Sequence, residues 1–131
     1  MRTKLKANVI ISNDADGKNV LFGFDDTLAE EIIDVYTRCV SGKFSVAAGG
    51  AVFEDIPFGD ITAVKGIFIK SGAGFNYIMN GGGDTFTANA ATTTGSSRVF
   101  LQTNLSNFRV INTSATDILT GIWVAWGDPT S

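Results

Sequence analysis

Residues 60–83, DITAVKGIFIKSGAGFNYIMNGGG, decide the fold class of this chain, because they hold two apolar runs with strand periodicity. The first run, 61–70, is apolar on both alternating faces, a pattern typical of a central strand covered on both sides. Residues 71–74, SGAG, predict a tight turn, and 75–79 predict a return strand. Asn80 and three glycines then end the strand, since these residues tolerate positive φ. The stretch therefore predicts a buried β-hairpin at the centre of a sandwich or barrel. In its first strand, the predicted faces are Ile61, Ala63, Ile67 and Ile69 on one side and Val64 and Phe68 on the other.

Outside this hairpin, short alternating apolar runs recur roughly every 8 to 12 residues between turn signals such as 13–17, NDADG. Only 26–40 has helical periodicity, and its β-branched residues favour a helical turn or loop over 26–30 followed by a strand. The pattern predicts an all-β fold, an antiparallel β-sandwich of about eight to ten strands. The predicted strands outside the hairpin are 5–12, 19–24, 31–40, 43–46, 51–56, 85–88, 98–103, 108–112 and 118–126.

The composition indicates one folded domain. We expect residues 1–131 to form a single β-sandwich, since this length suits one core and 44% of the residues are hydrophobic against 18% charged. No apolar run reaches the roughly 18 residues that span a bilayer, and the basic start has no cleavage site, so neither a membrane partner nor a signal peptide is expected. The single Cys39 cannot form an intramolecular disulfide, which fits synthesis in a reducing cytoplasm.

The missing residue types argue against catalysis. The chain has no histidine, and one cysteine cannot build a thiolate zinc site. No glycine-rich phosphate-binding motif occurs, and a net charge of −3 argues against nucleic acid as a partner. Residues 14–17 resemble part of a calcium loop, but Gly23 stands where the bidentate acid would be. Five acids over 25–34 suit a solvated face better than a carboxylate active site. We therefore expect no enzymatic activity, no cofactor and no metal.

The first residues are a candidate contact with a partner. Arg2, Lys4 and Lys6 place three cations within residues 1–6. This stretch is either a solvated end or a basic arm that binds an acidic surface. The polar stretch 84–97 is expected to be a surface excursion, and such loops often make contacts.

The strand 118–126 is a second candidate contact, because it is apolar on both faces. Trp123 and Trp126 fall on opposite faces of this strand. A tryptophan on each face predicts either core packing or a homo-oligomer interface.

Four segments together resemble the small all-β virion structural proteins of tailed bacteriophages. In those chains a Val-Lys and aliphatic strand is followed by a short strand ending in Asn-Gly-Gly, and an Asn-rich turn precedes the closing strand. The resemblance covers roughly 60–126; residues 25–34 and the tryptophan-rich end have no counterpart in it. It implies a jelly-roll-like structural protein that belongs to the capsid decoration, or cement, class. Such proteins commonly form trimers on the shell, so the homo-oligomer is expected to be a trimer. The segments are VKGIFIKS at 64–71, FNYIMNGG at 75–82, VFLQTN at 99–104 and FRVINTS at 108–114.

The resemblance implies a protein made in the host cytoplasm and located in the virion, where it binds the major capsid protein and stabilises the assembled shell. Two alternatives stay open. In a carbohydrate-binding sandwich, Tyr77, Trp123 or Trp126 would stack on a sugar while Asn76 or Asn80 bonded its hydroxyls. A tail or baseplate adaptor would differ from a decoration protein only in its position on the particle.

Overall fold

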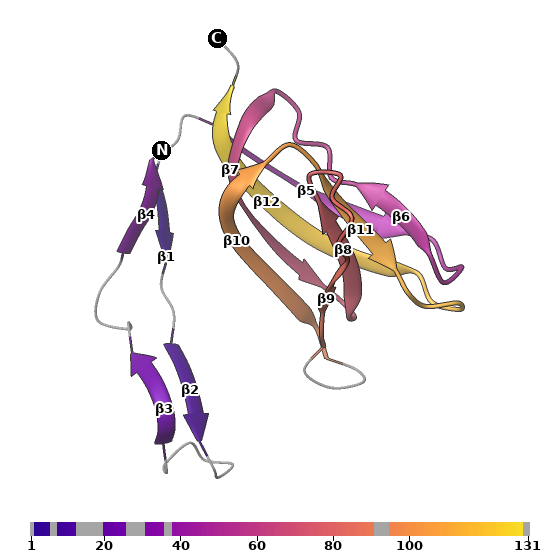
Figure 1. Ribbon diagram of the computed structural model, residues 1–131, viewed down its shortest axis with the longest axis horizontal. Coiled ribbons are helices and arrows are strands. Elements are labelled where there is room, and N and C mark those ends of the chain that lie inside the picture. The colour runs from indigo at the N-terminus through magenta and orange to yellow at the C-terminus, as the bar shows by residue number, and fades with distance from the viewer. Residues whose placement is uncertain are drawn as a thin grey trace. The chain divides into compact units, whose positions relative to one another are not determined.

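The computed structural model describes residues 2–5, 8–12, 20–25, 31–35, 38–90 and 95–129, with side chains described from residue 38 onward (Figure 1). Every regular element in this part of the chain is a β-strand. The chain divides into two compact units, residues 1–36 and residues 37–131.

The first unit consists of two antiparallel ladders, each with two strands in the described residues. Strand β1 (Arg2–Leu5) pairs with β4 (Glu31–Val35), and β2 (Asn8–Ser12) pairs with β3 (Val20–Asp25). We call residues 2–35 the ribbon. The strand predicted over 5–12 is thus two strands, while the predicted turns at 13–17 and 26–30 lie outside the described residues.

The second unit is a sandwich of two four-stranded antiparallel sheets. Sheet 1 has the order β10-β7-β12-β5, and sheet 2 has the order β6-β11-β8-β9. The prediction of an antiparallel β-sandwich is confirmed, and both of its four-stranded sheets are built from residues 37–131. The strands are β5 (Arg38–Val46), β6 (Val52–Asp55), β7 (Ile61–Ser71), β8 (Phe75–Met79), β9 (Phe86–Ala88), β10 (Ser97–Leu105), β11 (Phe108–Asn112) and β12 (Leu119–Pro129).

The connectivity of the sandwich is that of a jelly roll. Each connection along the chain crosses from one sheet to the other, except that β8 and β9 are neighbours in sheet 2. Eight strands that wind between two sheets in this order form the jelly roll, in which each sheet gives one face to the core.

The hairpin predicted over 60–83 is wrong, because β7 and β8 lie in different sheets. Strand β7 pairs with β10 and β12, whereas β8 pairs with β11 and β9. The turn at 71–74 is instead a corner between sheets, where the Gly72 amide donates a 2.9 Å hydrogen bond to the Thr120 carbonyl. Strand alternation and a glycine turn look the same in a hairpin and in a corner, so the local sequence does not separate them.

The predicted faces of β7 are also partly wrong. Ile61, Val64, Ile67 and Ile69 are all buried in the core. The ladder shifts register near Val64, on both the β10 and the β12 side, and this bulge turns Val64 inward. The opposite face of β7 is half-exposed at Phe68 and exposed at Lys70, whereas Gly66 on the same face is buried.

Asn112 joins the end of β11 to two neighbouring segments. Its buried Nδ2 donates to the carbonyls of Val46, Ala47 and Asp117 at 2.8–3.1 Å, and its Oδ1 accepts from the Ser114 amide at 3.0 Å. The side chain therefore satisfies backbone groups at a corner where no strand ladder can do so.

Candidate binding surface

The outer face of sheet 1, which points away from the core, carries exposed apolar side chains beside cations. Two rows of residues cross it from β10 to β5. One row is apolar and consists of Phe100, Phe68 and Val124, with Ser41 at its β5 end. In the other row, Ile122 lies among three cations. The exposed fractions of Phe100 and Ile122 are 40% and 50%. The second row is Arg98, Lys70, Ile122 and Lys43.

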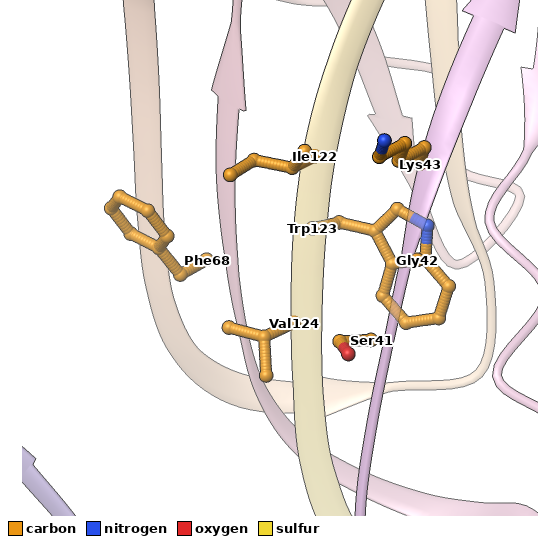
Figure 2. A pocket seen from close by; sticks show the side chains of 7 residues that line it. All are labelled: Ser41, Gly42, Lys43, Phe68, Ile122, Trp123 and Val124. Carbon is orange, nitrogen blue, oxygen red and sulfur yellow. The ribbon is translucent and has the colours of Figure 1, made fainter.

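A hollow of about 380 Å³ crosses this face over β7, β12 and β5 (Figure 2). Phe68, Ile122 and Val124 supply its apolar wall, and Ser41 and Lys43 lie at its β5 side. An open hollow with apolar walls and few polar groups suits an apolar side chain from a partner better than a polar small molecule.

The three cations of the outer face have no ion pair in the described residues. The other cations of the second unit do: Arg38 lies 3.1 Å from Asp60, Lys65 lies 2.9 Å from Asp128 and Arg109 lies 2.9 Å from Asp55. Arg98 and Lys70 are direct cross-strand neighbours, and like charges in such positions repel. A partner that brings carboxylates to this row would remove that repulsion.

Sheet 2 carries a different outer surface, in which charge is already neutralised. The Arg109 guanidinium donates to both carboxylate oxygens of Asp55, at 2.9 and 3.3 Å, and lies 3.9 Å from the centre of the Phe53 ring. These hydrogen bonds hold the pKa of the Asp55 carboxyl below its ordinary value and raise the pKa of Arg109. The arrangement stabilises the β6–β11 pair and neutralises the charge of Arg109 within the chain.

Both predicted interface tryptophans are buried within the chain. Trp123 is 4% exposed and belongs to the core, with its ring at 6.5 Å from that of Phe58. Trp126 is 3% exposed and lies 5.9 Å from the Phe100 ring, which belongs to the outer face. The predicted opposite faces are thus observed, but contact of either indole with a partner stays a prediction.

Each tryptophan lies opposite a glycine of the neighbouring strand, which the sequence reasoning missed. Trp123 is paired with Gly42 and Trp126 with Gly66. A Cβ added at Gly66 would come closer than 3.0 Å to the indole of Trp126, and one at Gly42 would lie 3.1 Å from that of Trp123. The missing side chains make room for the indoles, which in turn cover the glycines.

The residues named for sugar binding are engaged inside the chain. Tyr77 stacks between Phe86 and Phe108, with ring centres 5.5 and 5.1 Å away. Asn76 accepts a 3.0 Å hydrogen bond from the Thr87 hydroxyl. Asn80, at a φ of 57°, accepts one of 2.7 Å from the Ser106 amide. Together with the burial of both tryptophans, this leaves no exposed indole in the described residues for stacking on a sugar.

The predicted basic arm is part of a strand. Arg2 and Lys4 belong to β1, directly across from Val35 and Ile32 of β4, and Lys6 lies outside the described residues. Of the predicted loop over 84–97, residues 86–88 are strand β9 and Ser97 begins β10.

The described residues hold no group of three or more Cys, Asp or Glu side chains placed to bind a metal ion. Nor does any helix in this part of the chain have the length and apolarity needed to cross a membrane.

No protein-family model, no curated protein and no solved structure matches this chain.

Proposed function

We propose that this chain is a non-catalytic structural protein of a bacteriophage virion, which binds the assembled shell as a decoration protein and stabilises it. The observation that carries the proposal is the division into two units, a jelly-roll body and the ribbon. Two-stranded β-structure alone is marginally stable in water. A chain with four strands of residues 2–35 in such a ribbon is therefore best suited to an assembly, where a neighbouring subunit supports it.

The surface of the body supports the same class of function. Its candidate site is an open apolar face with cations, which fits a protein partner, and its buried tryptophans do not fit a sugar. The resemblance of 60–126 to virion proteins supplies the more specific role.

Mass action gives the stabilising mechanism. A subunit that binds only the assembled shell stabilises it by about 2.7 kcal/mol per site when its concentration is 100 times the dissociation constant. The proposed contacts with the major capsid protein are Arg2, Lys4, Lys6 and the segment 84–97, with the cations against an acidic shell surface.

The test is the copy number of this chain in purified virions, followed by rebinding to stripped capsids. Hundreds of copies per particle would support decoration, whereas a handful would indicate a tail or baseplate adaptor. No copies and no binding to capsids would overturn the virion role, and glycan-array binding would then test the sugar-binding alternative. Replacing Arg2, Lys4 and Lys6 by Gln keeps residues able to form strand β1, so reduced occupancy at low salt would identify a charge contact.

A further inference from the structure

The outer face of sheet 1 and the ribbon are complementary in charge. In the described residues the face has three cations without carboxylates, Lys43, Lys70 and Arg98, around exposed apolar side chains. Two such faces placed together would set cations against cations. The occupant of this face must therefore bring acidic groups as well as apolar ones.

The sequence of the ribbon contains that combination. Residues 20–35, VLFGFDDTLAEEIIDV, hold five acids among eight large apolar residues. Residues 1–36 have four basic and seven acidic residues, a net charge of −3, whereas residues 37–131 have six of each and are neutral. The ribbon thus carries the whole net charge of the chain, −3. This charge is equal in size and opposite in sign to that of the three cations on the outer face.

The ribbon also needs a surface. Its ladders have two strands each in the described residues, and a two-stranded ladder with many apolar residues gains stability by packing them against another layer. The outer face of sheet 1 offers apolar side chains and a hollow of about 380 Å³.

We propose that the ribbon of one copy of this chain binds the outer face of sheet 1 of a second copy, so that copies associate by exchanging ribbons. The five acids of residues 20–35 supply the negative charge for the row of cations, and the apolar residues of the same stretch cover Phe68, Phe100, Ile122 and Val124. Exchange between two copies gives a reciprocal dimer, whereas head-to-tail exchange among more copies closes as a ring such as a trimer. It does not depend on a virion role, because it needs only the chain itself.

Two charge-reversal variants of the full chain test this proposal in sedimentation velocity at about 50 μM protein and about 50 mM salt. The face variant is Lys43→Glu, Lys70→Glu, Arg98→Glu, and the ribbon variant is Asp25→Lys, Asp26→Lys, Glu30→Lys. We expect the natural chain to form a closed oligomer that weakens with added salt. Each variant alone should associate at least about 100-fold more weakly, since three attractive charges become repulsive.

Mixing the two variants separates ribbon exchange from other effects of charge. In an equal mixture, the acidic ribbon of the face variant can bind the natural, basic face of the ribbon variant. The basic ribbon of the ribbon variant can likewise bind the acidic face of the face variant. Association should therefore return in the mixture, and also in one chain that carries all six substitutions. A control with Glu54→Lys, Asp84→Lys and Asp117→Lys has the same change in net charge as the ribbon variant and should associate normally.

The apolar part of the contact has a matched control in the same strand region. Ile122→Ser, on the outer face, should weaken association at least about tenfold, whereas Ile118→Ser, which is exposed in the turn before β12, should not. The proposal is overturned if the natural chain is a monomer at this concentration, if the face variant associates like the natural chain, or if mixing restores nothing. The copy number in virions and the binding to capsids are measured separately, so either idea can fail alone.

Discussion

Replacing Gly66 by alanine should destabilise the jelly roll far more than one added methyl group suggests. Gly66 lies opposite Trp126, and the new Cβ would approach Cζ2, Cε2 and Nε1 of the indole to less than 3.0 Å. Because real Cβ atoms do not come so close to other heavy atoms, either the strand or the indole must move. Trp126 fills a place between Gly66 and Phe100 in which it is almost fully buried, so its displacement exposes apolar surface.

The magnitude combines two losses and one smaller gain. If a third of a buried indole of roughly 200 Å² becomes exposed, the loss is about 1.7 kcal/mol at 25 cal/mol per Å². Strain from overpacking adds about 1–3 kcal/mol. The lower chain entropy of alanine in the unfolded state returns at most about 1 kcal/mol. We expect Gly66→Ala to lower the free energy of unfolding by about 2–4 kcal/mol.

Urea unfolding followed by far-UV circular dichroism measures this change. Gly83→Ala is the matched control, because a Cβ at Gly83 meets no atom within 4 Å, and it should change stability by less than about 0.5 kcal/mol. In a Trp126→Phe background the shorter ring lacks the atoms that clash, so Gly66→Ala should cost at least about 1 kcal/mol less than in the natural chain. A Gly66→Ala protein with natural stability, or an equal cost in both backgrounds, would refute the reasoning.

Three further predictions concern the same unit. Phe108→Ala should lower the free energy of unfolding by about 3–5 kcal/mol, because Phe108 is completely buried. Phe53→Ala on the surface should lower it by about 1 kcal/mol or less. Equal losses for the two variants in urea unfolding would contradict this placement. Asn112→Ala leaves three carbonyls without their donor and should cost about 3 kcal/mol, against less than about 0.5 kcal/mol for the exposed Asn104→Ala in the same assay. Since the pKa of Asp55 is lowered in the folded state, its contribution is present above about pH 4 and is lost as the pH falls through the folded pKa. Asp55→Asn should therefore flatten the acid side of the pH–stability curve slightly, because the pair is more than a third exposed; a natural curve in the variant would argue against the ion pair.

The sequence was sufficient to predict most strands of the second unit, because alternation and turn residues are local signals. Strand β5 is the exception, since Arg38–Val46 is one strand where separate strands were predicted over 31–40 and 43–46. Residues 61–70, 75–79 and 108–112 agree with β7, β8 and β11 within one residue. Strand partners were not predictable in the same way. The turn at 71–74 carries the residues of a hairpin, and only the pairing of β7 with β10 and β12 shows that it is a corner.

The candidate surface was only indirectly visible in the sequence. Apolar residues on both faces of 61–70 and 118–126 indicated that two sides are covered, but alternation does not say by what. The row of cations depends on register, since Lys43, Lys70 and Arg98 are at least 27 residues apart along the chain and meet only when β5, β7 and β10 are assembled around β12. The glycine–tryptophan pairs depend on the same register, so no local pattern could have revealed them.

The place of β12 in sheet 1 also sets the order in which this unit can fold. Strand β12 is the last strand of the unit in the chain, yet it lies between β7 and β5, and in the described residues β5 has no other neighbour in that sheet. The pair of Arg38 with Gly127 closes a loop of almost the whole unit, and contacts of such long range make folding slow, on the order of milliseconds to seconds. Until β12 has been synthesised and inserted, β5 and one edge of β7 present unpaired backbone groups that another chain can pair with. During synthesis, protection from aggregation therefore depends on how quickly residues 119–129 reach the gap between these two strands.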